Sequence, residues 1–355
     1  MSKKKSDALS WEFANVWEQN NNPIWITSTI LLTRNIEKFL FPNKLSTENQ
    51  NQIYSLVTKE ISTSSFVTSP HSIRAEEASP TDKEYLYEHF LSSHSFQEAH
   101  NGEGFIVDQK GQLLITINIR DHIQFFWLEP FGDLEKSLSY LTQIETAIGK
   151  TIHYAFSAKF GFLTAHPADC GTGLIVTTFL QVPALIHTKS LDDFLVKHTD
   201  ESISVTGLQG RPGELIGDFL VVHNHFTLGF TEESILSALR GFTIKLLVRE
   251  QGLRVQLKQD KPVEIMDKVS RAYGILLHSY QIDAIEALDA LSMVKLGLDV
   301  GWIAGVEMAT LNRLIFATRR AHLIKELQHE VSPIELTHKR AEYIHKALKE
   351  AKLLI

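Results

Sequence analysis

The sequence has 355 residues, of which 43% are hydrophobic and 22% are charged, and its formal net charge is −7. Its length allows two domains with substantial cores, and its composition is ordinary for a soluble globular protein. The negative net charge argues against broad nucleic-acid binding, which requires clustered lysine and arginine.

The N-terminal residues 1–22 are polar and form a segment of their own, without the apolar stretch that a signal peptide needs. No apolar run approaches the ~20 residues that span a bilayer. The single cysteine, Cys170, cannot form an internal disulfide. We therefore expect a cytoplasmic protein that binds neither nucleic acid nor a membrane.

The pattern of apolar residues then predicts helices followed by a sheet. Residues 45–100 read as helices joined by Ser/Pro loops, whereas alternation of apolar and polar residues over 104–130 predicts antiparallel strands. Helical spacing returns at 134–152, and Thr231 is a suitable N-cap for another helix. Further strands are expected over 173–185, 202–208 and 217–229.

The clearest domain boundary is QDKPVE at 259–264, where Pro262 interrupts a helical pattern. Beyond it the pattern is helical throughout, and Ser332–Glu335 has the form of a capping box with proline at the first helical position. An apolar stripe in this part fits either internal packing or a dimer surface; it comprises Ile265, Val269, Tyr273 and Leu276. We predict an α+β domain over 23–260, helical to about 100 and with its sheet over 104–260, and an all-helical domain over 263–355.

Residues 163–179, LTAHPADCGTGLIVTTF, contain a G-x-G turn that leads into a β-branched run. Gly171 and Gly173 would let backbone N–H groups approach an anion closely. Phosphate-binding loops usually supply a lysine or arginine as well, but the run after Gly173 contains no base. The loop has the shape of a phosphate site without its cation.

Several segments together resemble the ATP:guanido phosphotransferases (phosphagen kinases), and among these the bacterial protein-arginine kinases of the McsB type. The resemblance covers nearly the whole chain and implies an antiparallel sheet flanked by helices, followed by a McsB-type helical domain. It also implies phosphoryl transfer from ATP to protein arginine. The segments are TSTILLTRN (27–35) with FP at 41–42, YEHFLSS (87–93), NIRDHIQ (118–124), GFLTAHPADCGTGLIVTTFLQVPAL (161–185), VTGLQGRPGELIGDFLVVHNHFTLG (205–229), SRAYGILLHS (270–279) and KRAEYIHKAL (339–348).

The same resemblance implies that the active site is degenerate. The family holds the nucleotide phosphates with arginines, and the matching positions here are Thr29, Leu31, Gln124, Ile175 and Thr206. The catalytic carboxylates fall on Ile119 and Arg120, the reactive cysteine on His166, and a loop glutamate on Arg211. Retained positions are Asp121, His122 and Glu214 in the catalytic set, and His89, Gly171, Gly173, Gly207 and Gly210 in the nucleotide set. Five lost charged hydrogen bonds correspond to roughly 7–15 kcal/mol of phosphate binding.

We therefore predict a catalytically inactive homologue that acts by protein–protein interaction in stress or proteolysis regulation and binds no cofactor. The resemblance implies a McsA-like adaptor and the Clp protease machinery as partners, and a homodimer formed through the helical domain. One alternative is an active protein-arginine kinase that binds Mg-ATP at a site rebuilt from Arg34, Arg120, Arg211 and His166. The other is a phosphoarginine-binding module.

Individual residues leave further alternatives. Arg340 and Ala341 match the end of the family's phosphoarginine-binding RDxxRA motif, although its first arginine and aspartate are missing. Arg120, Arg211 and His166 form either a new anion site or a solvated rim. His223 and His225 share one strand face, but without complementary ligands nearby we expect solvent-facing histidines and no metal site. We expect Cys170 to be a small buried residue, and Asp121 and His122 to make structural hydrogen bonds.

Overall fold

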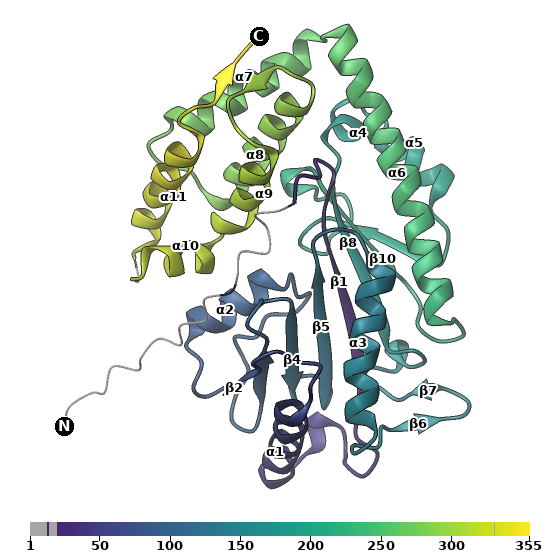
Figure 1. Ribbon diagram of the computed structural model, residues 1–355. Helices are drawn as coiled ribbons and strands as arrows, with labels where there is room; N and C mark the ends of the chain where they lie inside the picture. Colours follow the sequence, from purple (N-terminus) through teal and green to yellow (C-terminus); the bar gives the residue numbers. More distant parts are fainter. Residues whose placement is uncertain (1–12, 14–19, 330) are drawn as a thin grey trace, which may run out of the picture.

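The computed structural model describes residue 13, residues 20–329 and residues 331–355. Of the polar N-terminal segment predicted over 1–22, all but residues 13 and 20–22 therefore lie outside the described residues. A large sheet occupies the centre, in the order β2-β3-β4-β5-β1-β8-β10-β9, and all neighbouring strands are antiparallel (Figure 1). Its strands are β1 (Trp25–Arg34), β2 (His71–Arg74), β3 (Gly104–Val107), β4 (Leu113–Ile117), β5 (Ile123–Glu129), β8 (Leu174–Gln181), β9 (Ile203–Thr206) and β10 (Phe219–Asn224).

Helices flank the sheet and form most of the C-terminal part of the chain. Those in the first part of the chain are α1 (Thr47–Thr63), α2 (Pro80–His89), α3 (Leu134–Gly149), α4 (Pro183–His187), α5 (Leu191–His198) and α6 (Glu232–Asp260). The later ones are α7 (Val263–His278), α8 (Ala284–Asp299), α9 (Met308–Ala317), α10 (Arg320–Leu327) and α11 (Pro333–Leu348). No helix in the described ranges has the length and apolar character needed to cross a bilayer.

Helices α3 and α6 lie along one face of the sheet (Figure 1). Alternate residues of the central strands, such as Ile30, Leu32 and Val176, are fully buried on that face because successive side chains of a strand point to opposite sides. The helices start where the sequence indicates: Asp133 caps α3, and Thr231 caps α6 through a capping box with Ser234. The core of the protein is therefore the layer between this sheet face and the two helices.

The α+β class with an antiparallel sheet and a helical C-terminal part is confirmed, but three local predictions are wrong. The segment expected to be helical to about residue 100 contains β2, which extends the sheet edge by pairing with β3. The strand expected over 173–185 ends at Gln181, because Pro183 cannot donate to a ladder and opens α4 instead. The C-terminal part is not all-helical, since β11 (Ile303–Ala304) pairs with β12 (Lys352–Leu353) and fixes the chain end.

The predicted boundary coincides with a break between helices. Helix α6 ends at Asp260, Lys261 adopts a left-handed conformation with φ 46°, and α7 begins after Pro262. The apolar stripe of α7 packs internally rather than forming a free dimer surface: Val269 and Leu276 are fully buried, and the Tyr273 hydroxyl donates to the Ala351 carbonyl. The division of the chain into two domains at this point stays a prediction.

A buried ion pair joins the end of β1 to α3. The Arg34 Nε atom lies 2.6 Å from Glu145 Oε1, and the two side chains are 2% and 9% exposed. We expect Arg34→Met to lower the free energy of unfolding by about 3–5 kcal/mol, because Glu145 would be left as an uncompensated buried charge. Urea unfolding followed by circular dichroism measures this. The double variant Arg34→Met with Glu145→Leu should recover most of the loss, and a single variant within 1 kcal/mol of wild type would contradict the assignment.

Candidate functional site

The five positions that the resemblance assigns to phosphate-binding arginines lie on one face of the sheet, opposite the face that α3 and α6 cover. Thr29 pairs with Thr177, and Leu31 pairs with both Phe126 and Ile175. Directly paired residues of antiparallel strands point to the same side. The register extends this face to Gln124 on β5, which pairs with Thr33, and to Thr206 on β9, which pairs with Val221. We call this side of β5, β1, β8, β10 and β9 the open face.

The open face is nearly free of charge. Leu31, Ile175 and Thr206 are half-buried, whereas Thr29 and Gln124 are almost fully buried. The only titratable side chain that these five strands place on it is His223. Burial lowers the pKa of His223 below its ordinary value of 6.5, so the imidazole is neutral at pH 7. Multiple phosphate charges would meet no counter-charge on this face.

The G-x-G loop uses its backbone donors inside the protein. The Gly171 N–H donates to the Phe162 carbonyl at 3.2 Å, and the Thr172 N–H donates to the Thr227 carbonyl at 3.1 Å. Glycine is required at 171 because its φ is +117° and a Cβ atom would lie 2.3 Å from the Thr227 oxygen. Gly171 therefore allows two chain segments to pack closely. The N–H groups of Gly171 and Thr172 bind carbonyls of the protein, so neither is available to an anion.

The Arg34 side chain binds the backbone of the same loop. One of its terminal nitrogens donates to the carbonyls of Thr33 and Thr172, at 2.8 and 2.9 Å. Its guanidinium lies over the Phe162 ring at 3.5 Å, and its Nε binds Glu145. All of these partners are structural, so Arg34 is committed to holding the loop and cannot serve a rebuilt phosphate site without breaking them.

Asp121 and His122 tie together three chain segments at the end of the open face. The Asp121 carboxylate accepts from Asn35 Nδ2 at 2.6 Å and from the Ala165 N–H at 2.7 Å. His122 Nδ1 accepts from the Ile36 N–H, and Nε2 then donates to the Leu40 carbonyl. Burial raises the pKa of Asp121 and lowers that of His122 to about 4. Both residues hold the loops in place, and their hydrogen-bond partners in the described part of the chain include no serine, threonine or cysteine side chain.

The three basic replacements lie on three different loops. Arg120 and His166 are exposed, and His166 Nδ1 lies 3.8 Å from Asp169 on its own loop. Arg211 is exposed on the glycine-containing loop and lies 3.5 Å from Glu214. Ile119, at the other carboxylate position, packs against the core.

The 207–214 loop is closed by its own backbone. The Gly207 N–H donates to the Arg211 carbonyl at 3.0 Å, and the Gly210 N–H donates to the Gly207 carbonyl at 2.9 Å. Glu214, which retains the family residue, is half-buried at the end of this loop. These glycines therefore shape a turn beside the open face.

Two other predicted ligand-binding residues are enclosed in the protein. His89 is fully buried: Nε2 lies 2.8 Å from the Gly111 carbonyl, and its ring contacts Phe13 and His322. Burial lowers the pKa of His89 to about 3. Arg340 is 3% exposed and donates to the carbonyls of Thr318 and Ile282. In this conformation both side chains are used for packing between elements.

The remaining candidates are Cys170 and the two histidines of β10 and its following loop, His223 and His225. Cys170 is only half-buried, contrary to the prediction, and its sulfur lies 3.4 Å from the Thr164 hydroxyl. His223 is half-buried rather than solvent-facing, whereas His225 is exposed. Among the described residues, no group of histidine, cysteine, aspartate and glutamate side chains could hold a metal ion.

Sequence reasoning missed the residues that hold the site together. Asn35 binds both Asp121 and the His122 N–H, and Thr227 anchors the G-x-G loop. These contacts join positions far apart in the chain, so no local pattern indicates them. The sequence does indicate one feature of the site: Thr29 and Leu31 are two residues apart, so in a strand both side chains point to the same face.

Comparison with known proteins places the chain in a class. The family model for the ATP:guanido phosphotransferase C-terminal catalytic domain matches residues 52–253, and that for the protein-arginine kinase McsB C-terminal domain matches residues 262–353. The chain therefore belongs to the ATP:guanido phosphotransferases. Solved structures agree in fold: a taurocyamine kinase from Schistosoma mansoni and a lombricine kinase each superpose with a TM-score of 0.57, at 22% and 18% identity. They cover 64% and 69% of this chain, which spans 33% and 72% of theirs.

Within that class the chain belongs to the protein-arginine kinase family. It is 32% identical to the protein-arginine kinase of Halothermothrix orenii over 331 residues, which cover 92% of this chain and 95% of the relative. It is 33% identical to that of Chlamydia pneumoniae, with 88% and 87% covered. The match extends across both the sheet and the C-terminal helices.

The packing around Gly171 yields a stability prediction. Gly171→Ala should lower the free energy of unfolding by about 3–4 kcal/mol, because it combines an unfavourable φ with a collision against the Thr227 carbonyl. Gly210→Ala is the matched control, since its φ is +76° but no atom lies within 4 Å of the added Cβ. We expect about 1–2 kcal/mol for the control. Equal losses in urea unfolding would contradict the close approach at Gly171.

The buried imidazole of His122 predicts a pH dependence of stability. Its pKa of about 4 in the folded protein lies below the ordinary value of 6.5, so between these values only the unfolded chain binds the proton. The free energy of unfolding should therefore fall as pH falls from 6.5 to 4. Urea unfolding across this range should show a shallower fall for His122→Gln than for wild type. The exposed His166→Gln is the control, and parallel curves for wild type and His122→Gln would refute the assignment.

Proposed function

We propose that this member of the protein-arginine kinase family does not transfer phosphoryl groups and acts by binding other proteins. The observation that carries the proposal is the open face, where five positions matching phosphate-binding arginines are neutral. Phosphoryl transfer depends on positioned cations that neutralise the phosphate oxygens, and one arginine at the transferring group is worth about 10³–10⁵ in rate. With neutral residues at all five positions, the strands of the open face supply no arginine to stabilise such a transition state.

The surroundings of the open face support the same conclusion. The G-x-G loop directs the N–H groups of Gly171 and Thr172 to carbonyls of the protein. Arg34 is bound to Glu145 and to backbone carbonyls. Ile119 and Arg120 stand where the resemblance implies the carboxylates that orient and deprotonate the guanidinium, and neither side chain can accept a proton from it. We therefore propose that the protein neither activates an arginine substrate nor binds the nucleotide.

The partners remain part of this proposal. The resemblance to the protein-arginine kinases suggests a McsA-like adaptor and the Clp protease machinery, and association of two copies through the C-terminal helices. Such a protein would regulate proteolysis by occupying a partner rather than by phosphorylating it.

Calorimetric titration of Mg-ATP at low salt tests the loss of nucleotide binding. We expect no saturable heat up to millimolar nucleotide and no transfer of labelled phosphate to arginine in a protein substrate. The protein-arginine kinase of Halothermothrix orenii, assayed in parallel, is the positive control. Micromolar binding together with transfer would overturn the proposal and favour the active kinase. Binding of phosphoarginine without binding of ATP would instead favour a phosphoarginine-binding module.

A further inference from the structure

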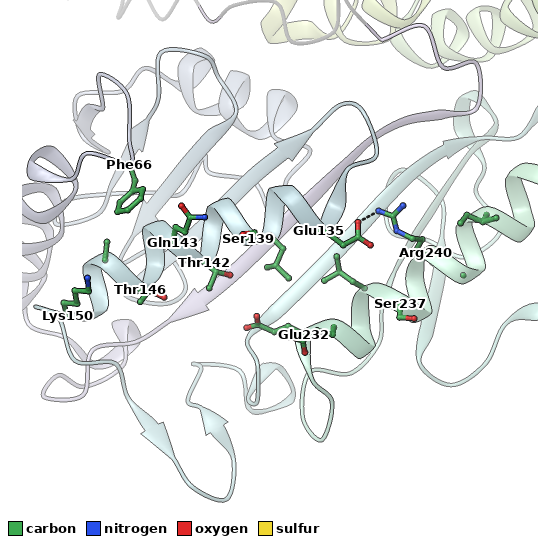
Figure 2. Close-up of a pocket in the computed structure, with 16 residues that line it drawn as sticks. Phe66, Glu135, Ser139, Thr142, Gln143, Thr146, Lys150, Glu232, Ser237 and Arg240 are labelled. Carbon is green, nitrogen blue, oxygen red and sulfur yellow. Dashed lines mark hydrogen bonds and ion pairs between the residues drawn. The ribbon is translucent and has the colours of Figure 1, made fainter.

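A second concave surface lies on the covered side of the sheet, between α3 and α6 (Figure 2). It is a groove of about 890 Å³, and the sheet separates it from the open face. The α3 wall consists of Glu135, Leu138, Ser139, Thr142, Gln143, Thr146, Ala147 and Lys150. The α6 wall consists of Glu232, Glu233, Leu236, Ser237, Arg240, Gly241 and Ile244, and Phe66 closes one end.

The groove has an apolar floor that continues beyond its ends. Leu138 and Leu236 line the groove and are almost fully buried, so they form its floor. Phe66 at one end and Ile244 at the other are 38% and 47% exposed. Val248, one helical turn beyond Ile244 on α6, is 68% exposed. Exposed apolar side chains beside a groove mark a candidate site for a partner.

The dimensions favour a polypeptide over a small ligand. Lining residues on α3 run from Glu135 to Lys150, and at 1.5 Å per helical residue this corresponds to a length of about 22 Å. The walls carry small or short side chains, including Ala147, Ser237 and Gly241, which leave room between the two helices. A helix of four turns or an extended segment of about seven residues matches this length.

The charges in the groove indicate what the partner must supply. Arg240 already forms an ion pair with Glu135, which Figure 2 shows across the groove. Glu232 and Glu233 stand in the first turn of α6, and no ion pair within the described part of the chain reaches either one. Glu232 is half-buried, and burial raises its pKa; the Arg34 guanidinium opposes this shift, and the carboxylates of Glu145 and Glu233 add to it. A half-desolvated carboxylate beside a second one gains most from a cation brought by a partner.

We propose that the groove between α3 and α6 binds a segment of another polypeptide that presents an arginine or lysine between aliphatic side chains. The basic group would bind Glu232 and Glu233, while the aliphatic side chains would cover Leu138, Leu236 and Ile244. Because this binding uses neither the open face nor a nucleotide, it stands independently of whether phosphoryl transfer is lost.

Fluorescence anisotropy with designed peptides tests the charge requirement. The probe is a labelled 14-residue helical peptide of alanine, leucine and glutamine with two adjacent arginines, and the reference peptide has glutamine in place of both. We expect the arginine peptide to bind wild type at least ten-fold more tightly, and Glu232→Gln with Glu233→Gln to reduce this preference to within two-fold. Glu264→Gln, which removes an exposed first-turn glutamate from α7, should leave it unchanged. Equal affinities of the two peptides for wild type would overturn the proposal.

A second pair of variants tests the location. Gly241 lines the groove, whereas Gly252 lies three turns further along α6 and beyond it, and an added Cβ meets no atom within 4 Å at either position. Both substitutions to lysine add the same charge and favour the helix. Gly241→Lys should weaken binding of the arginine peptide at least ten-fold, and Gly252→Lys should weaken it less than two-fold. Equal effects of the two variants would place the binding elsewhere and refute the groove.

Discussion

The arrangement of this protein depends on the two-sided character of β1, the strand at the centre of its sheet. Ile30 and Leu32 point toward α3 and α6 and are fully buried, whereas Thr29 and Leu31 point to the open face. A shift of one residue in register would exchange the two sets, so the buried side fixes which residues reach the site. Packing on one side of β1 therefore determines which side chains face the other side, and those side chains are uncharged.

The G-x-G loop does have a cation beside it, but the cation faces inward. Arg34 ends β1, holds the Thr172 carbonyl and pairs with Glu145 of α3, so the loop, the strand and the helix meet at one guanidinium. Its planar fork suits this, because it donates to a carboxylate and to carbonyls in fixed directions. The neighbouring loops are joined in a similar way by Asn35 and Asp121. A loop that the sequence suggests for phosphate is in the structure a junction between elements.

Much of the fold could be predicted because it rests on local patterns. Alternation indicated β3, β4 and β5, and the caps at Thr231 and Ser332 were recognisable by residue type. The resemblance to a family supplied the rest of the architecture. The environment of individual side chains could not be predicted in this way, because it depends on distant elements. His89 is enclosed by α10 through His322, and Arg340 is held by carbonyls of two other segments. The groove between α3 and α6 likewise exists only once both helices lie on the sheet.

Charges in this molecule fall into two groups with different physical consequences. Arg254, Glu250 and Lys295 are buried, and their partners include Asp299 and Gln181, which join α6 and α8 to β8. Removing one member of such a set leaves an uncompensated charge in the interior, which destabilises a protein by about 3–5 kcal/mol. A charge that lines an open face has water as an alternative partner, so a neutral residue there leaves the fold intact. Because of this asymmetry, the open face can carry neutral residues while the rest of the fold keeps its packing. Glu232 and Glu233, which form no ion pair with any described residue, lie on the other side of the sheet and line the groove between α3 and α6.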